Sequence, residues 1–405
     1  MMAATKNTKA LYNIQIPGDW EVKHLSYAVQ IQGGYAFKSE LFSNEGIPVI
    51  RISNIQENRV LIDETCYCED DKLTAFIIHE GDMLIAMSGA TTGKIGKYTF
   101  RSKAYLNQRV GRFLFNEDRI EPEYVYHYFL YPNTLKYLLL DAMGGAQPNI
   151  SNDNIERIKI PLPPLPEQKA IAQLLTTADA AIHTTEKLIA QKELRKKWLM
   201  QQLLTGKKRL KGFGGEWKEM HLSDMFTERN ESKYYDLPLL SIGQNGVYPQ
   251  DESVKKDTSN EDKSKYKRIC PGDIGYNTMR MWQGRSALSE LEGIVSPAYT
   301  VVTPKKKADS LFFSYLFKMP KMTNLFWRNS QGLVDDTLNC KFKDFSIVKV
   351  VLPTTKEEQT AIAQVLQAAD KEISLLKAKV EKLREQKKGL MQQLLTGKVR
   401  LKLII

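Results

Sequence analysis

The run from Tyr276 to Arg285 concentrates side chains that can read DNA bases. It holds two arginines, an indole and two side-chain amides within ten residues. Arginine forms paired hydrogen bonds with guanine, and asparagine or glutamine can do the same with adenine. A purely structural role for the run stays open. The predicted DNA-binding residues here are Asn277, Arg280, Trp282, Gln283 and Arg285.

A second set of candidate DNA contacts is spread over the N-terminal part of the chain. Within it, the run from Gly89 to Lys94 resembles a phosphate loop, but three residues separate its glycines where that motif has four. The loop either brings Lys94 and backbone amides to a DNA phosphate or is a simple turn. The predicted residues are Lys38, Arg51, Asn54, Lys94, Asn107, Arg109, Gln147 and Asn149.

The sequence offers no carrier for catalytic chemistry. Ser296-Pro-Ala-Tyr299 resembles the Asn/Asp-Pro-Pro-aromatic motif of amino-methyltransferases, but the amide or acid that would hold the target amino group is missing. No zinc-protease or nucleophile-elbow motif occurs, and the five histidines are dispersed. Cys66, Cys68, Cys270 and Cys340 are too scattered for a disulfide framework or a zinc site. We therefore expect no catalytic residue, no metal ligand and no cofactor in this chain.

An internal repeat indicates which elements position these side chains. The sequence MQQLLTG begins at Met200 and again at Met391, an offset of 191 residues, and the same offset relates Gln168 to Gln359. A repeat this long reports duplication of a whole module. The chain is therefore predicted to contain two similar halves, each of which ends in a long helix.

Each repeat contains a predicted helix with recognisable ends. Both helices begin just after prolines, with glutamates in the first turn, and both end at Thr-Gly. Between these ends the apolar residues recur in alternating steps of four and three, which is a heptad seam. A helix of about 40 residues is roughly 60 Å long, so its seam needs a second helix. Heptad spacing does not determine whether the two helices run parallel or antiparallel, but the symmetry of a duplicated chain favours antiparallel pairing. Polar residues that interrupt the seam and could set its register are Thr185, Lys192, Lys196 and Lys387.

The rest of the chain forms two modules that are only distantly alike. Short strand-like runs predict small sheets, with one helical stretch per module near 122–140 and 310–326. We expect an α+β fold in which two globular mixed α/β domains are separated by two long helices. The helices would pair as an antiparallel coiled coil in a pseudo-two-fold duplicated arrangement. The expected boundaries are 1–160 and 212–352 for the domains, and 161–211 and 353–405 for the helices.

Charge and hydropathy restrict the class of protein further. The 405 residues include 58 Lys and Arg against 47 Asp and Glu, a net charge of +11. Positive charge favours polyanionic partners, although the signal is not specific. The sequence has no apolar run of about 18 residues and no N-terminal apolar segment of signal-peptide length. We therefore expect a cytoplasmic protein without membrane contact.

Taken together, these motifs resemble the specificity subunit of type I restriction–modification enzymes along essentially the whole chain. The resemblance is carried by two helix starts, Leu165-Pro-Glu-Gln168 and Lys356-Glu-Glu-Gln359, by the paired Ala-Ile-Ala-Gln and MQQLLTGK segments, and by the runs 276–285 and 293–299. It implies two target recognition domains, each of which reads one half of a bipartite, asymmetric site in double-stranded DNA.

The resemblance also implies partner proteins. Two methyltransferase subunits would dock by pseudo-symmetry on the near-identical helices, and restriction subunits would join them. S-adenosylmethionine, ATP and magnesium would belong to those partners. The repeated glutamines are the expected docking residues: Gln168, Gln173, Gln201, Gln202, Gln359, Gln364, Gln392 and Gln393. The alternative is a coiled-coil structural adaptor that does not read DNA directly.

Overall fold

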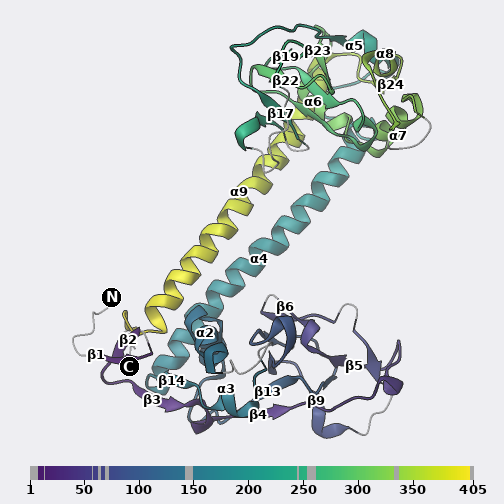
Figure 1. The fold of residues 1–405 in the computed structure, drawn as a ribbon. Coiled ribbons are helices and arrows are strands. Elements are labelled where there is room, and N and C mark those ends of the chain that lie inside the picture. The colour runs from purple at the N-terminus through teal and green to yellow at the C-terminus, as the bar shows by residue number, and fades with distance from the viewer. Residues whose placement is uncertain are drawn as a thin grey trace. The chain divides into compact units, whose positions relative to one another are not determined.

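The computed structural model describes residues 8–12, 14–56, 58–62, 65–68, 73–141, 149–243, 246–252, 261–332 and 337–401. Their contacts divide the chain into two units. Unit 1 contains residues 1–185 and 379–405, and unit 2 contains residues 186–378. Each unit therefore combines one globular region with part of helix α4 (Leu165–Leu203) and part of helix α9 (Lys356–Leu394) (Figure 1).

Unit 1 is built on two mixed sheets. The larger has the order β4 (Val29–Gly33), β13 (Val110–Phe115), β10 (Met83–Ala86), β11 (Ile95–Lys97), β7 (Arg59–Val60) and β6 (Ile55–Gln56). The smaller has the order β8 (Tyr67–Cys68), β5 (Ile47–Ile50), β12 (Ala104–Leu106) and β9 (Ile77–Ile78). Two antiparallel pairs complete the strands: β1 (Thr8–Leu11) with β2 (Ile14–Pro17), and β3 (Glu21–His24) with β14 (Lys159–Leu162). The short helices are α1 (Pro122–Leu130), α2 (Pro132–Asp141) and α3 (Asn152–Glu156).

Unit 2 has one four-stranded sheet with the order β16 (Phe226–Glu228), β23 (Tyr299–Pro304), β20 (Ile274–Asn277) and β21 (Ser286–Leu288). Three antiparallel pairs join β15 (Lys218–His221) to β24 (Lys349–Leu352), β17 (Leu240–Ile242) to β18 (Val247–Pro249), and β19 (Lys267–Ile269) to β22 (Gly293–Val295). The short helices are α5 (Leu222–Met225), α6 (Ser310–Leu316), α7 (Pro320–Asn329) and α8 (Phe342–Ser346).

The two units repeat one topology. The order β4-β13-β10-β11 in unit 1 matches β16-β23-β20-β21 in unit 2, and the pair β3–β14 matches β15–β24. In both units the last strand, β14 or β24, leads directly into a long helix. The predicted duplicated α+β fold is therefore confirmed.

The helical stretch predicted in each module is broken by a proline. Helix α1 ends before Pro132, which starts α2, and α6 ends before Pro320, which starts α7. Proline restricts the residue before it to extended conformations. Tyr131 and Met319 accordingly have ψ angles of 124° and 140°. Each predicted helical stretch is therefore present as two short helices that meet near a proline.

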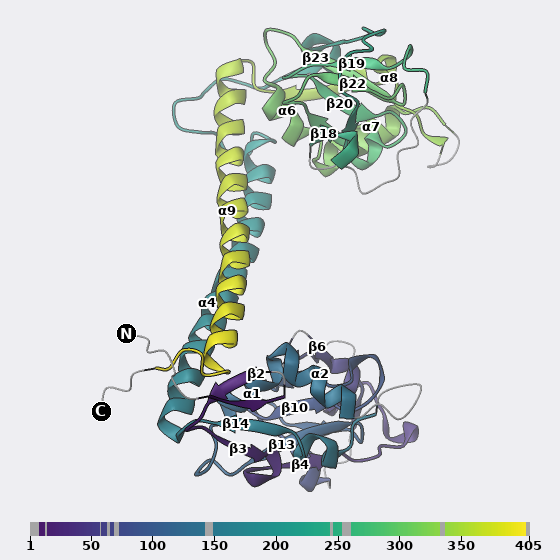
Figure 2. The same ribbon diagram turned by 60° about the vertical axis from the view of Figure 1, so that its left-hand side comes forward.

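The long helices pair in antiparallel fashion. In unit 1 the Lys387 ammonium, late in α9, lies 2.6 Å from Asp179 in the first half of α4. In unit 2 Lys196, late in α4, lies 2.5 Å from Asp370 early in α9. Apolar residues of the predicted seam, such as Ile171 and Leu175 in α4 and Ile362 and Leu366 in α9, are buried, and Figures 1 and 2 show the two helices side by side. The predicted antiparallel coiled coil is confirmed, and three of its polar interruptions, Lys192, Lys196 and Lys387, form cross-helix ion pairs.

Each globular core includes both helices. In unit 1, Trp20 is fully buried in one cluster with Leu175 of α4 and Leu394 of α9. In unit 2, Phe313 is buried with Leu203 of α4 and Ile362 of α9. Burial of this much apolar surface fixes each globular region on the helix ends that it contacts.

Two kinds of feature are not found in the described residues. No helix there is long and apolar enough to cross a membrane. No group of three or more His, Cys, Asp or Glu side chains there could hold a metal ion.

Candidate nucleic-acid interface

In unit 1, the connection from β10 to β11 forms a tight tip around the 3-10 turn η5 (Gly89–Thr91). Gly93 has a φ of 80°, which glycine adopts without steric cost, and its N–H donates to the Ala86 carbonyl at 2.7 Å. The Ala86 N–H donates in turn to the Lys94 carbonyl at 2.9 Å. These backbone bonds hold the Lys94 side chain at the tip, where it is exposed.

Unit 2 builds the same tip between β20 and β21, around the 3-10 turn η7 (Met281–Gln283). Gly284 has a φ of 73° and lies close to α7, since a Cβ atom placed on it would be 3.2 Å from Thr323 Cγ2. The Asn277 N–H donates to the Arg285 carbonyl at 3.1 Å, as Ala86 does to Lys94. The exposed Arg285 therefore occupies the position that corresponds to Lys94.

Two further segments border the unit 1 tip. The Met87 N–H donates to the Arg109 carbonyl at 2.9 Å, and the Ile150 N–H donates to the Met87 carbonyl at 2.8 Å. The side chains of Arg109 and Asn149 are exposed. The structure thus brings together three of the predicted DNA-binding residues, Lys94, Arg109 and Asn149, around the end of β10.

The same two segments border the unit 2 tip. The Thr278 N–H donates to the Ala298 carbonyl at 3.1 Å, and the Cys340 N–H donates to the Thr278 carbonyl at 2.8 Å. The turn 296–299 is therefore the counterpart of the turn 107–110 in unit 1. This equivalence explains the turn that looked like a methyltransferase motif, because it borders a hairpin tip in both units.

Asn54 is buried and uses its side-chain amide inside unit 1. Its Nδ2 donates to the Leu61 carbonyl at 3.0 Å and to Thr65 Oγ1 at 2.7 Å, and its Oδ1 accepts from the Arg51 N–H at 2.9 Å. This burial, 4% exposed, argues against the predicted DNA contact of Asn54. Its amide instead shapes the 3-10 turn η3 (Ile52–Asn54), which contacts η5 of the tip through the bond from Thr91 Oγ1 to the Ile52 carbonyl at 3.0 Å.

The other predictions for unit 1 fall at different places. Arg51 is half-buried at the start of η3, and Asn107 is half-buried in the turn beside the tip. Lys38 is exposed at the start of the 3-10 turn η2 (Ser39–Leu41). Gln147 lies outside the described residues.

Two residues predicted to read bases in unit 2 hold the shape of the tip. Asn277 Oδ1 accepts from the Met279 N–H at 3.0 Å, and the Trp282 indole donates to the Met279 carbonyl at 3.1 Å. These contacts give both side chains a structural role. In the rest of the predicted set, Gln283 and Arg285 are exposed and Arg280 is half-buried.

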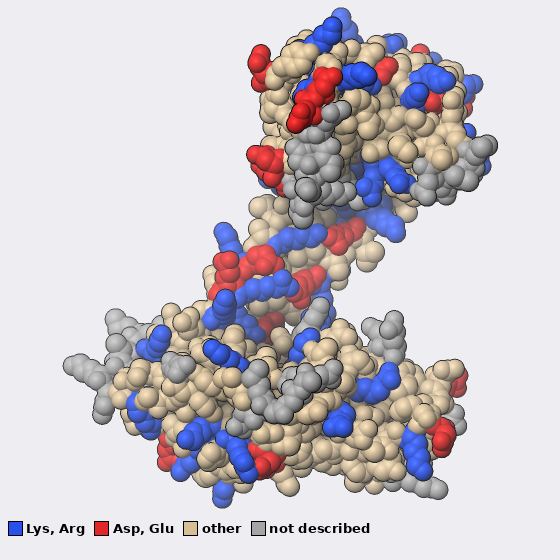
Figure 3. Space-filling view, in the orientation of Figure 1, with Lys and Arg blue, Asp and Glu red and all other residues tan. Residues whose placement is uncertain are grey.

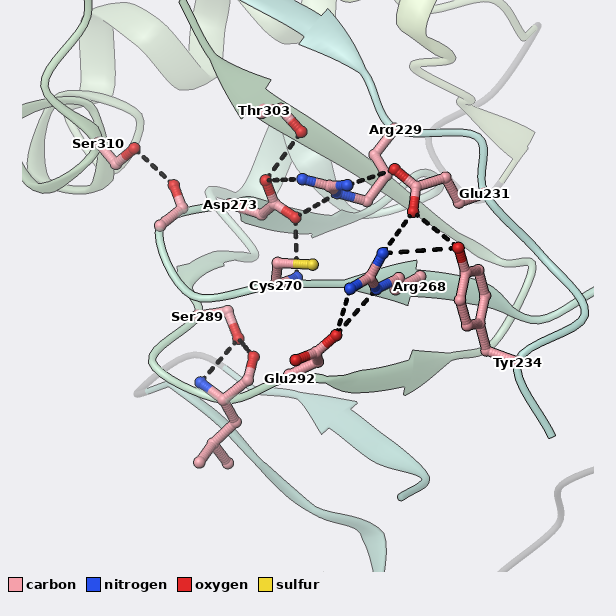
Figure 4. Close-up of polar contacts among 12 residues, drawn as sticks. Arg229, Glu231, Tyr234, Arg268, Cys270, Asp273, Ser289, Glu292, Thr303 and Ser310 are labelled. Carbon is pink, nitrogen blue, oxygen red and sulfur yellow. Dashed lines mark hydrogen bonds and ion pairs between the residues drawn. The ribbon is translucent and has the colours of Figure 1, made fainter. Parts of the chain in front are cut away.

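A buried carboxylate fixes the start of β20, the strand that carries the unit 2 tip. Asp273 accepts from Arg229 Nε at 2.6 Å, from Thr303 Oγ1 at 2.8 Å and from the Cys270 N–H at 2.8 Å (Figure 4). The bond to Asp273 raises the pKa of Arg229. Asp82, which precedes β10, accepts the equivalent backbone bond at 2.8 Å. Both tips are therefore anchored by an aspartate at the base of the hairpin.

Arg268 extends this network to the surface of unit 2. Its guanidinium donates to Glu292 at 2.9 Å and to Glu231 at 2.9 Å, and it lies 4.9 Å from the centre of the Tyr234 ring (Figure 4). These two bonds, with Glu292 first, raise the pKa of Arg268. Because two carboxylates neutralise this cation, it is a poor candidate for contact with DNA phosphate.

The glutamines predicted to bind partners differ in accessibility. Gln168 and Gln359 are buried, and their Oε1 atoms accept from the backbone N–H groups of Glu121 and Asp309 at 3.0 and 2.9 Å. These two side chains join each globular region to the start of a long helix, which argues against their predicted partner contacts. In the remaining set, Gln173, Gln201, Gln364, Gln392 and Gln393 are exposed and Gln202 is half-buried.

One duplicated cluster was not anticipated from the sequence. In unit 1, Arg400 pairs with the buried Glu167, which also accepts from the Trp20 indole at 3.3 Å. The cluster recurs in unit 2 as Arg209, Glu358 and Trp217. The two arginines lie 191 residues apart, as do the two glutamates, so the repeat already contained this signal.

Charge is distributed differently over the globular regions and the helices. Figure 3 shows Lys and Arg side chains scattered over both globular regions, whereas on the helices they alternate with Asp and Glu. Cross-helix pairs such as Lys192–Glu372 and Lys377–Glu193, at 2.5 and 2.7 Å, account for part of this alternation.

Two regions of the chain, 17–193 and 214–385, match the family described as type I restriction modification DNA specificity domain. A putative type I restriction enzyme MjaX specificity subunit from Methanocaldococcus jannaschii is 30% identical over 427 residues, which cover 96% of this chain and 95% of that protein. The type I restriction enzyme MjaVIII specificity subunit from the same organism is 34% identical over 204 residues, which cover 49% of this chain and 48% of that protein.

Solved structures show the same fold. The type I restriction–modification S subunit from M. genitalium superposes with a TM-score of 0.59 at 14% identity, and the match covers 95% of this chain and 97% of that one. A chain from a study of assembly and conformational transition in a type I restriction–modification system superposes with a TM-score of 0.57 at 16% identity, covering 95% and 99%.

Proposed function

Since the chain belongs to the family of type I restriction–modification DNA specificity subunits, its function is DNA sequence specificity, and we propose that each unit reads one half of a bipartite site. The two half-sites would differ in sequence, because the residues that surround the two tips differ. The whole site would therefore be asymmetric.

One observation carries this proposal: the two units present different side chains on the same backbone scaffold. The Lys94 carbonyl accepts from the Ala86 N–H in unit 1, and the Arg285 carbonyl accepts in the same way from the Asn277 N–H in unit 2, at 2.9 and 3.1 Å. The neighbouring turn carries Arg109 in unit 1 and Ala298 in unit 2. A scaffold that is kept while its exposed side chains change is suited to reading two different sequences.

The exposed side chains at the tips have the chemistry of base readout. Arg285 can donate two hydrogen bonds to guanine, and Gln283 can pair with adenine. In unit 1, Asn149 can pair with adenine, and Arg109 and Lys94 can each bind guanine or a phosphate. We propose these five residues as the principal DNA contacts.

The helices would serve as the scaffold for partner subunits. Helices α4 and α9 each run through both units, and both carry exposed glutamines near their ends. Gln201 and Gln392, and likewise Gln173 and Gln364, occupy equivalent positions in the repeat. We propose that two methyltransferase subunits dock on these equivalent faces and that restriction subunits join the complex. Methyl transfer and cleavage, with S-adenosylmethionine, ATP and magnesium, would take place in those partners.

The proposal is tested by mapping modified adenines in the genome of cells that carry this chain and its methyltransferase partner. The expected result is one motif with two specified parts, different from each other and separated by unspecified bases. A continuous or palindromic motif would contradict the proposal that each unit reads a different half-site. Methylation without any sequence preference would instead support the adaptor alternative.

A further inference from the structure

A cavity of about 430 Å³ lies beside the unit 2 tip and is lined by three lysines. These are Lys267, Lys341 and Lys343, and the one acidic residue in the lining is Glu228. Glu228 Oε1 lies 3.4 Å from Lys267 Nζ, so it neutralises only that lysine. The cavity is therefore cationic, and its charge comes from Lys341 and Lys343.

These two ammonium groups are available to a ligand. Both side chains are exposed, and within the described residues neither ammonium has an ion-pair partner. The Asn339 side chain also lines the cavity, and its buried Oδ1 has no hydrogen-bond partner among those residues. An amide oxygen accepts hydrogen bonds and so cannot pair with a phosphate, which also only accepts, and the evidence for an anionic ligand is therefore the two ammonium groups.

Unit 1 places its positive charge differently at the corresponding location. Lys341 is the N-cap of α8, and its counterpart in unit 1 is Ser151, the N-cap of α3. Lys343 corresponds in the same way to Asp153. The turn beside the tip, however, carries Arg109 in unit 1 and Ala298 in unit 2, and Ala298 lines the cavity. Each unit thus has exposed cations next to its tip, but from different segments.

We propose that the unit 2 cavity binds a phosphate group of the DNA backbone, next to the bases that the tip reads. This inference rests on the proposed function. Lysine binds phosphate as a point charge, and such contacts fix the register of a protein on DNA without reading its sequence. The Lys341 and Lys343 ammonium groups would hold the phosphate, and Arg109 would do so in unit 1.

The inference is tested by measuring the DNA affinity of the full chain with its methyltransferase partner over a series of salt concentrations. The double variant Lys341→Ala/Lys343→Ala should bind specific and non-specific duplexes more weakly by the same factor. The slope of log affinity against log salt should become shallower by about 0.9 for each phosphate that the variant no longer neutralises. Lys349→Ala is the matched control, because this exposed lysine lies on β24 outside the cavity, and its slope should not change.

Single neutral methylphosphonate linkages along the duplex would locate the phosphate. At one position beside the unit 2 half-site, the neutral linkage should weaken binding by wild type and have no further effect on the double variant. Titration of inorganic phosphate at constant ionic strength tests the other source of the same chemistry. If the cavity lysines are needed for free phosphate but leave the DNA salt slope unchanged, the assignment to DNA is overturned.

Ala298→Arg in the double variant gives a test by rescue, since it installs in unit 2 the cation that unit 1 carries at Arg109. The expected result is recovery of most of the salt slope with the half-site sequence unchanged. If the double variant keeps wild-type affinity and slope while Arg285→Ala still loses its half-site, the phosphate site is refuted and the proposed function stands. If neither variant changes DNA binding, the proposed function fails as well.

Discussion

The guanidinium of Arg400 holds the carboxylate of Glu167 through two hydrogen bonds of 2.5 and 2.6 Å, although 233 residues separate them in the chain. Arg209 and Glu358 make the same pair in unit 2, at 2.5 and 2.7 Å. In each unit the arginine follows the end of one long helix and the glutamate lies in the first turn of the other. The duplicated pair therefore ties the two antiparallel helices together at the globular region of each unit.

We predict that Arg400→Ala destabilises unit 1 by about 3 kcal/mol, because it leaves a buried carboxylate without its cation. The Glu167 side chain is only 4% exposed, and its remaining side-chain partner would be the Trp20 indole. Denaturant unfolding, followed by a probe within unit 1, measures the change in free energy.

The matched control for this prediction is Lys349→Ala. Lys349 pairs with Glu219 at 3.6 Å, but both side chains are more than half exposed. Exposed pairs of this kind contribute about 0–1 kcal/mol. If both variants lost the same free energy of unfolding, the buried Arg400–Glu167 pair would stabilise the protein no more than an exposed pair does.

The cross-helix pair Lys387–Asp179 should be energetically coupled. The Lys387 ammonium lies 2.6 and 2.7 Å from the two Asp179 oxygens, and the lysine side chain is 12% exposed. A double-mutant cycle with alanine at each position should give a coupling energy of about 1–3 kcal/mol. Lys377–Glu193, an exposed cross-helix pair at 2.7 Å, is the control and should give about 0.5 kcal/mol. Coupling energies of the same size would argue against a role for Lys387 in helix register.

Unit 1 should lose stability in mild acid through His127. Burial, helped by the charges of Lys387 and Lys97, lowers the pKa of His127 from 6.5 to about 3. Asp179, 3.8 Å from Nδ1, would oppose this shift, but it is already paired with Lys387. The unfolded chain therefore binds a proton between about pH 6.5 and 3 that the folded unit does not. Stability is complete above this range and falls as the pH drops through it.

The measurement is the unfolding free energy of wild type and of His127→Gln at pH 7, 6 and 5. Wild type should lose up to about 1.4 kcal/mol more per pH unit than the variant once the pH is well below 6.5. Comparing the slopes removes the contribution of other titrating groups. Parallel slopes would show that His127 is not held neutral in the folded state.

The helices were predictable because their signals are local. A heptad seam repeats along each one, and residues such as Ile171 and Leu366 lie where the spacing puts them, fully buried. The direction of pairing was inferred from symmetry, and the ion pairs of Asp179 and Asp370 confirm it. Periodicity is set by residues that are close in the sequence, so it can be recognised without knowledge of the tertiary structure.

The accessibility of individual polar residues was not predictable in the same way. Asn54, Gln168 and Gln359 look like surface amides in the sequence, but all three are buried. Asn54 bonds to the Leu61 carbonyl seven residues away, and Gln168 and Gln359 accept from backbone N–H groups 47 and 50 residues away. Whether an amide faces solvent or a buried N–H is decided by tertiary packing. The equivalence of Lys94 and Arg285 is a different case, because the 191-residue offset already related them.

The most direct test of the account is the recognition motif of two single variants, Lys94→Ala and Arg285→Ala, obtained by mapping modified adenines against wild type. Removal of one good base-reading side chain costs about 1–3 kcal/mol at the base pair concerned. The account predicts that Lys94→Ala weakens or relaxes one half of the motif and Arg285→Ala the other, with the untouched half and the spacing unchanged. Changes in both halves from either variant, or an unchanged motif from both, would contradict it.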